Sequence, residues 1–327
     1  MDIVKMIFKF LAGLLIFLSV SCTGLHQSAK KVDIPLQYVT VVEDGTRLSE
    51  YAPVFVIEES TKNFNRIGTP AVHKDKNEHP DVYIDPEQPS IYAMEQQFED
   101  KNRKFTNLIY RIHFQETPLP HLTAGKNVGL ITIVTLDQDN RPLLVTTVHT
   151  CGCYLSIIPT SHLSLQAYPE NWPSDKQNVY GELHPAVLKV NPSFNSKQRV
   201  VAWIRSETHR VMDLDLWPEN HPLPSTNSVT ATLKPMSALT KLPFGATEIS
   251  FFETHGPRKG YVRNSHKPLE KLLMSWWSMD WRVGEDKDLG PKEQTGTTFY
   301  TSLKFWAREK SDLWNFSDFL KYWGWKL

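Results

Sequence analysis

The residues of this chain with the clearest chemical potential lie between His149 and Cys153. The stretch "VTTVHTCGCYLSII" (145–158) holds two of the three cysteines, separated by one glycine and shortly preceded by a histidine. Alternate side chains of a β-strand share one face, so the stretch predicts His149, Cys151 and Cys153 in a row on the same side. Gly152 removes the side chain between the cysteines and permits a bend that brings both toward one centre.

A metal site is the first hypothesis for this row. Imidazole and thiolate groups are ligands of soft metal ions, so His149, Cys151 and Cys153 could bind zinc, copper or haem iron. A fourth ligand would have to come from elsewhere. The nearest candidates by sequence are His113, on another predicted strand, and His162, just after the cysteine stretch.

The cysteine pair also fits a disulfide or a redox dithiol. Disulfides are natural outside the cytoplasm, although an extended strand puts cysteines two residues apart near the upper end of the usual Cα separation. Gly152 could relieve that strain. In one alternative, Cys151 and Cys153 therefore form a structural staple in a non-catalytic binding or assembly protein. In the other, they form a dithiol switch.

A nucleophilic cysteine is a further alternative. The "TCGC" stretch resembles in part the motif of L,D-transpeptidases, in which serine or threonine, histidine, glycine and cysteine follow one another. Cys151 stands where that family has histidine, and Tyr154 stands where it has arginine or asparagine. A cysteine nucleophile also needs a base, which His149 would have to supply. The sequence therefore leaves open whether the chain is an enzyme.

The first residues have the pattern of a secretory signal. Two lysines precede an apolar run that is too short to span a bilayer comfortably as a helix. The run ends in "LSVSC" (18–22), which resembles the lipobox of bacterial lipoprotein precursors, with Ser19 where leucine is usual. The resemblance implies a lipid on Cys22. Thr23, and not aspartate, follows Cys22, and the resemblance therefore implies that the lipoprotein is located in the outer membrane.

These features predict a cell-envelope lipoprotein that faces the periplasm or the surface and meets the membrane through its N-terminal lipid. Residues 22–31 are small and polar, as expected of a tether. The 36 basic and 36 acidic residues cancel, so no global field attracts nucleic acid, which is excluded as a partner.

The residues from 32 onward are predicted to form an all-β or β-dominated α+β fold with sandwich-like antiparallel sheets. "YRIHFQ" alternates Tyr110, Ile112 and Phe114 with polar residues, and "VGLITIVTL" (128–136) is apolar on both faces. The turn formers "DQDNRP" predict a hairpin whose second strand carries both cysteines. A second hairpin is predicted where "RVVAWIR" meets "RVMDLDLW".

The C-terminal part differs from the rest, because seven of the ten tryptophans lie from Trp276 onward. "KPLEKLLMSWW" and "SDLWNFSDFLKYW" have apolar residues at helical spacing, and Ser265 could cap the first helix. These aromatic residues either fill a junction with the sheet or form a surface for a protein or glycan partner. The charged "GEDKDLG" (284–290) is predicted to be a surface turn.

The predicted organisation therefore has four parts. Residues 1–21 are the signal peptide, 22–31 the tether, 32–260 an antiparallel β domain, and 261–327 an aromatic-rich, partly helical region packed on that domain.

If Cys22 carries a lipid, Cys22→Ser should move the protein from the membrane fraction to the soluble fraction. The membranes should first be washed with alkaline carbonate, which removes proteins held only by surface contacts. Immunoblots of the two fractions provide the measurement. Wash-resistant membrane association of the variant would contradict lipidation at Cys22.

Overall fold

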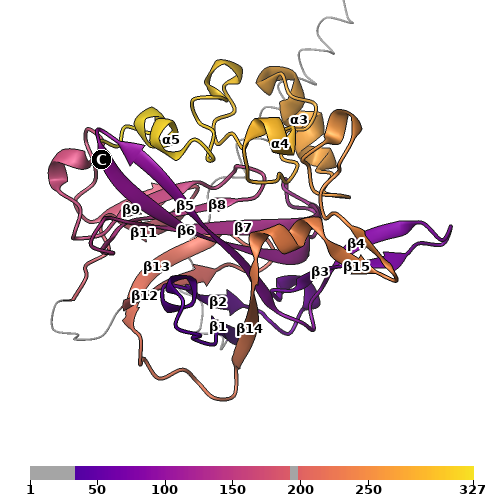
Figure 1. The fold of residues 1–327 in the computed structure, drawn as a ribbon, viewed down its shortest axis with the longest axis horizontal. Coiled ribbons are helices and arrows are strands. Elements are labelled where there is room, and N and C mark those ends of the chain that lie inside the picture. The colour runs from indigo at the N-terminus through magenta and orange to yellow at the C-terminus, as the bar shows by residue number, and fades with distance from the viewer. Residues whose placement is uncertain (1–33, 192–197) are drawn as a thin grey trace, which may run out of the picture. The chain divides into compact units, whose positions relative to one another are not determined.

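A ten-stranded sheet organises the fold (Figure 1). Its strand order is β13-β12-β2-β1-β14-β5-β6-β7-β8-β9. The prediction of a β-dominated fold is confirmed. The strands are β1 (Leu36–Val41), β2 (Val54–Glu58), β5 (Ser90–Asp100), β6 (Arg103–Thr117), β7 (Gly125–Leu136), β8 (Pro142–His149), β9 (Ser156–Pro159), β12 (Gln198–Ile204), β13 (Val211–Pro218) and β14 (Ser228–Pro235).

The computed structural model describes residues 34–191 and 198–327. Residues Pro35–Leu327 form one compact unit. The signal peptide (1–21), Cys22 and the tether (22–31) predicted from the sequence lie outside the described residues. Within 34–191 and 198–327, no helix is long and apolar enough to cross a membrane.

The sheet combines the predicted hairpins with parallel pairs that the sequence did not reveal. β7 pairs with β8 and β12 pairs with β13, both antiparallel, as the turn residues predicted. β1 pairs with β14, β2 with β12 and β5 with β14 in parallel. Alternation of apolar residues shows which face of a strand is buried but not the direction of the neighbouring strand. The parallel pairs could therefore be identified only from the tertiary structure.

The central strands are buried on both faces. Tyr110, Ile112 and Phe114 of β6 share one core cluster with residues of β1, β2, β12 and β13. Ile109 of β6 and Ile131 of β7 belong to a second cluster, which the C-terminal region completes. Figure 1 shows the same arrangement, with α3, α4 and α5 on one side of β5–β8 and with β1, β2, β12 and β14 on the other.

A buried histidine connects the two edge strands of this curled sheet. His184 lies on β11 (Glu182–Pro185), which pairs with β10 (Lys176–Val179). Its Nδ1 is 2.9 Å from Ser156 Oγ on β9, and its Nε2 is 2.9 Å from the Val211 carbonyl oxygen on β13. Burial lowers the pKa of His184. The neutral ring therefore accepts one hydrogen bond and donates the other.

The remaining elements are short. Two small hairpins and several helical turns surround the sheet. They are β3 (Thr69–Lys74), β4 (Pro80–Asp85), β15 (Leu242–Phe244), β16 (Thr247–Ile249), α2 (Arg47–Glu50), α3 (Pro268–Ser278), α4 (Lys292–Thr295), α5 (Phe316–Tyr322), η2 (Asn63–Asn65), η3 (Leu165–Ala167), η4 (Met236–Thr240), η5 (Gly256–Arg258) and η6 (Phe305–Ala307).

The C-terminal region agrees with the helix predictions in part. α3 forms where expected, but Ser265 does not cap it. Its hydroxyl donates to the Val262 carbonyl, and Lys267 holds the N-cap position without a side-chain bond. The second helix, α5, is shorter than predicted. The last residues pack on the core, because Trp325 is fully buried there.

Phe319 of α5 tests how much this packing contributes, because its ring is fully buried in the second cluster. Phe319→Ala should lower the free energy of unfolding by about 3–5 kcal/mol, since it leaves a cavity that its neighbours fill only partly. Phe305→Ala, at an exposed position of the same region, should change it by less than about 0.5 kcal/mol. Urea denaturation measures both. Equal effects would show that α5 does not contribute to the core.

Candidate functional site: a buried dithiol turn

The strand that leads into the cysteines ends earlier than the sequence predicted. β8 stops at His149, and residues 150–155 form a turn before β9. The His149 N–H donates to the Cys153 carbonyl at 2.9 Å, and the Gly152 N–H donates to the His149 carbonyl at 2.7 Å. The prediction that both cysteines lie on the second strand of the hairpin, on one face with His149, is therefore wrong.

Gly152 is the physical reason for the turn. Its φ of 92° lies in the left-handed region that favours glycine. The site is also too crowded for a side chain, because a Cβ atom would lie 2.1 Å from the Tyr300 carbonyl oxygen. The glycine thus bends the chain between the cysteines and lets the C-terminal region contact the turn.

The bend brings the two cysteines together as free thiols. The Cys153 N–H donates to Cys151 Sγ at 3.4 Å. Cys151 is buried, whereas Cys153 is only partly buried. These contacts form a compact pair in which Cys153 is the more accessible member.

The environment separates the acidities of the two thiols. Burial alone would raise the pKa of Cys151, but its hydrogen bond with Cys153 and the positive charge of Lys267 outweigh burial and lower that pKa below its ordinary value. The hydrogen bond to Cys151, together with burial, raises the pKa of Cys153 well above its ordinary value. The pair therefore favours a thiolate at Cys151 and a thiol at Cys153.

Lys267 contributes its charge from a fully buried position just before α3. Its Nζ lies 3.3 Å from Asp286 Oδ2, and each side chain is 1% exposed. Burial opposes the charge of Lys267, but Asp286 and Cys151 outweigh it and raise the Lys267 pKa. The Thr150 hydroxyl donates to the other oxygen of Asp286. The ion pair therefore binds the cysteine turn to the start of α3.

A second buried lysine holds the backbone of the turn. Lys287 Nζ donates to the Cys151 carbonyl at 2.6 Å, and the Lys287 N–H donates to the Thr150 carbonyl at 2.9 Å. Nζ also lies 4.3 Å from the centre of the Tyr300 ring, within the range of a cation–π contact.

Further charged groups lie around the turn. Lys267 and Lys287 are both positive, whereas Asp286 supplies one negative charge. Burial raises the pKa of the nearby Glu270 carboxyl, which makes its ionised form less favourable. A buried charge is costly unless it is compensated, and of these groups Lys267 acts to lower the pKa of Cys151, whereas Asp286 and Glu270 act to raise it.

Two of these residues, Asp286 and Lys287, belong to the segment 284–290 that was predicted to be a surface turn, and that prediction is wrong. Asp286, Lys287 and the adjacent Glu285 are all buried. Their charges resemble those of a solvated turn, and no local signal pairs Asp286 with Lys267. Sequence reasoning also missed Lys267, which looked like an ordinary residue before a helix.

The structure places two of the predicted histidine ligands in separate hydrogen bonds. His149 Nε2 lies 3.0 Å from the His209 carbonyl oxygen, and burial lowers the pKa of His149 to about 4. Arg111 Nε donates to His113 Nε2 at 3.0 Å, and burial, with the charge of Arg111, lowers the pKa of His113 well below its ordinary value. Both rings are neutral near pH 7.

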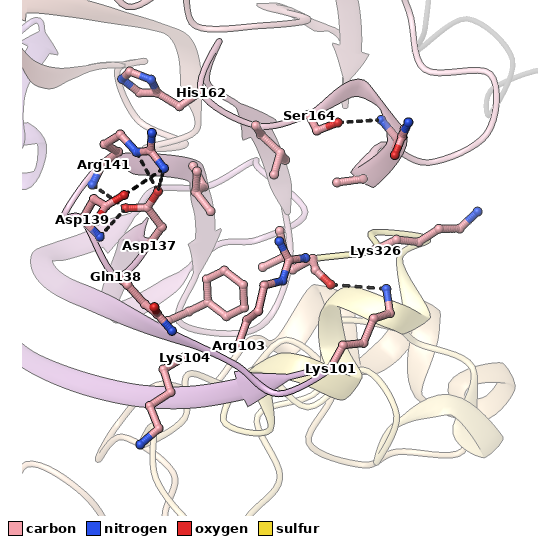
Figure 2. A pocket seen from close by; sticks show the side chains of 16 residues that line it. Lys101, Arg103, Lys104, Asp137, Gln138, Asp139, Arg141, His162, Ser164 and Lys326 are labelled. Carbon is pink, nitrogen blue, oxygen red and sulfur yellow. Dashed lines mark hydrogen bonds and ion pairs between the residues drawn. The ribbon is translucent and has the colours of Figure 1, made fainter.

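The third histidine, His162, lies at the other end of β8. It lines a pocket of about 590 Å³, with Arg141, Lys104 and Lys326 among the other lining residues (Figure 2). The eight residues of β8 span about 25 Å and separate this pocket from the cysteine turn. His162 is therefore not brought to the cysteines.

In the part of the chain that the structure describes, no group of three or more His, Cys, Asp or Glu side chains is placed to hold a metal ion. The geometry thus gives no added support to zinc, copper or haem iron at His149, Cys151 and Cys153. It brings the two cysteines together and adds a buried cation beside them.

Two tyrosine rings pack together at the turn, which contains Tyr154. Tyr180, at the tip of the β10–β11 hairpin, contacts the edge of the Tyr154 ring, with ring centres 5.2 Å apart. Arg210 donates to the Tyr180 carbonyl at 2.8 Å and holds the tip in place. Beside it is a pocket of about 350 Å³, whose lining includes Leu155, Trp172 and Tyr180. Leu155, two residues after Cys153, belongs to this lining, so the pocket adjoins the turn.

We compared the chain with known protein families, curated proteins and solved structures, and none matched. The chemistry of the turn is therefore the evidence for function. It is a pair of free cysteines, of which Cys151 has a lowered pKa, next to the buried ammonium group of Lys267.

Lys267→Met should raise the pKa at which the cysteine pair first ionises, because the variant loses the positive charge that favours the thiolate. At any pH below the new pKa, the variant then holds less thiolate than the wild type. A titration of the thiolate ultraviolet absorbance measures the change.

Two variants serve as controls for this titration. Lys267→Arg keeps the charge and should leave the pKa near that of the wild type. Lys271→Met removes an exposed lysine of α3 and should have no effect. An unchanged titration of Lys267→Met would show that Lys267 does not act on the thiols.

Proposed function

We propose that this chain is a cell-envelope lipoprotein whose Cys151–Cys153 pair exchanges disulfides with a partner that carries two thiols. The observation that carries the proposal is the contact between the two cysteines beside buried Lys267. Lys267 favours the Cys151 thiolate, which belongs to the reduced form. Stabilising the reduced form makes the disulfide form a stronger oxidant. The oxidised pair would therefore accept two electrons from its partner.

The two cysteines have different roles in this exchange. A partner thiolate attacks the sulfur of Cys153, which is the more accessible of the two. The bond between Cys151 and Cys153 breaks, and Cys151 leaves as a thiolate beside Lys267. A leaving thiol with a lowered pKa departs faster. The product of this half is a mixed disulfide between Cys153 and the partner.

The second half releases the partner. Its other thiol attacks the partner sulfur of the mixed disulfide and passes its proton to Cys153 as that bond breaks. The partner leaves with a new disulfide, having lost two electrons. The chain retains a thiolate at Cys151 and a thiol at Cys153, which is the protonation state that the surroundings favour.

A purely structural staple explains this site less well. A disulfide between residues 151 and 153 closes a loop of three residues, and the chain-entropy relation gives it only about 1.6 kcal/mol. The turn is already held by the hydrogen bonds of Lys287 and by the bond between His149 and Cys153. A disulfide would thus add little to stability, and a buried lysine beside a permanent disulfide would have no thiolate to stabilise.

The envelope location rests on the N-terminal sequence. The short apolar run and the "LSVSC" stretch support export and lipidation at Cys22. An oxidising compartment also allows a thiol pair to cycle through its disulfide form, which the reducing cytosol opposes.

The proposal is tested by trapping the mixed disulfide with oxidised glutathione. In Cys151→Ser, Cys153 has no second cysteine with which to form a disulfide. This variant should therefore accumulate one glutathione adduct, which dithiothreitol removes. Cys153→Ser leaves only buried Cys151 and should form little adduct. The double variant Cys151→Ser/Cys153→Ser corrects for any reaction at Cys22. Intact mass spectrometry reads out all three.

The wild type provides the second measurement. In oxidised glutathione it should lose about two mass units, and reduced glutathione should restore them without unfolding. A disulfide that resists reduction until the protein unfolds would contradict exchange and favour the staple. About one equivalent of zinc, copper or haem iron in protein from the native envelope would instead favour the metal hypothesis.

A further inference from the structure

α3 packs with its apolar side outward. Trp276 is 76% exposed and Leu272 is 73% exposed, whereas Glu270, Ser275 and Ser278 are buried. The spacing of the apolar residues predicted a helix correctly, but these residues face solvent instead of the core. An amphipathic helix in a globular protein normally has the opposite orientation.

The exposed apolar area extends beyond α3. Arg308 donates to the Ser278 carbonyl and pairs with Asp280, which holds the η6 segment against the end of α3. Phe305 and Trp306 of η6 line a shallow hollow together with Asp280. We call this area the tryptophan surface. It consists of Leu272, Leu273, Trp276, Trp277, Met279, Trp281, Phe305 and Trp306, all exposed.

A surface of this kind indicates an interaction site. Single exposed apolar residues are common, but soluble chains rarely expose a group of large apolar side chains together. Four of the eight residues are tryptophans, whose rings have an apolar body and a polar N–H. Tryptophan is enriched where a membrane meets water, because both parts are satisfied there.

Positive charges accompany the surface. Lys271 lies on α3 with its Nζ 6.0 Å from the centre of the Trp281 ring, and exposed Lys304 directly precedes Phe305. Apolar aromatic residues next to lysines are the features of segments that lie in the interface of an anionic membrane.

We propose that the tryptophan surface docks onto the lipid bilayer and holds the folded unit against the membrane. The choice of a bilayer rests on the lipid-anchor part of the proposed function. If Cys22 carries a lipid, residues 22–33 allow the folded unit to move at most about 40 Å from the bilayer. The anchored membrane is then a large apolar phase that stays close to the folded unit.

The test uses the full chain purified from its native envelope and reconstituted into vesicles of phosphatidylethanolamine and phosphatidylglycerol with brominated acyl chains. Bromine quenches only those tryptophans that enter the lipid. The wild type should lose fluorescence relative to unbrominated vesicles. Leu272→Glu/Leu273→Glu keeps all ten tryptophans but puts charge on the surface, so it should lose most of this quenching.

A matched control separates docking from a general effect of added charge. Leu119→Glu/Leu165→Glu changes two leucines that are 72% and 78% exposed outside the tryptophan surface. This control should be quenched like the wild type. Exposed leucines tolerate glutamate, and melting curves should confirm that both variants remain folded.

Three results would overturn the inference. The first is that the membrane-bound wild type shows no quenching. The second is that Leu272→Glu/Leu273→Glu is quenched as strongly as the wild type. The third is that the wild type self-associates without being quenched and that Leu272→Glu/Leu273→Glu abolishes this self-association. The last result would assign the surface to a second copy of the chain. The intact mass separately shows whether Cys22 carries a lipid. The proposal of a lipid anchor and the proposal of a docking surface can therefore be contradicted independently.

Discussion

The buried ion pair between Lys267 and Asp286 is the interaction on which the candidate site depends. It connects the start of α3 to the segment that also carries Lys287, and through Thr150 it reaches the cysteine turn. Removing two charges from water is expensive, and replacing such pairs by apolar residues is often neutral or stabilising. The pair is therefore better explained by what its charge does to the thiols than by a contribution to stability.

The same buried charges account for the unusual orientation of α3. Glu270, on the inner side of the helix, packs so closely over Gly284 that a Cβ atom there would lie 1.5 Å from its carboxylate oxygen. Glu270 interacts electrostatically with a polar cluster of Lys267, Asp286 and Lys287 beneath the helix, and Ser275 and Ser278 are buried like Glu270. A polar inner side leaves the apolar residues facing outward. The charged residues beside the cysteine turn thus also interact with the buried side of α3, whose apolar residues are exposed.

The two proposals describe complementary features of one molecule. The proposed exchange uses the sulfur of Cys153, the less buried of the two cysteines, in a turn that adjoins an aromatic pocket lined in part by Tyr180. The tryptophan surface would restrict where that exchange occurs, because a docked unit meets its partners at the membrane. Exchange needs only a diffusing partner, so the chemistry of the turn does not depend on docking.

Local patterns in the sequence determined a large part of this protein. The alternation in β6, the apolar run in β7 and the turn residues before β8 specify strands and hairpins through short-range rules, and the structure contains each of them. The spacing of residues 268–278 likewise specified α3. The sequence also singled out Cys151, Gly152 and Cys153, because few residue types combine such chemistry with such backbone freedom.

Only the tertiary structure decided what surrounds those elements. Period two does not encode strand direction, so the parallel pairs of β14 could not be predicted. Helical spacing identifies the apolar side of a helix but does not show whether that side faces the core or the solvent. For α3, the orientation depends on the polar cluster beneath the helix. Lys267 and Asp286 look like surface charges until the chain brings them together. A buried charge acquires its chemical effect from distant residues that exclude water, and a linear pattern does not show which residues those are.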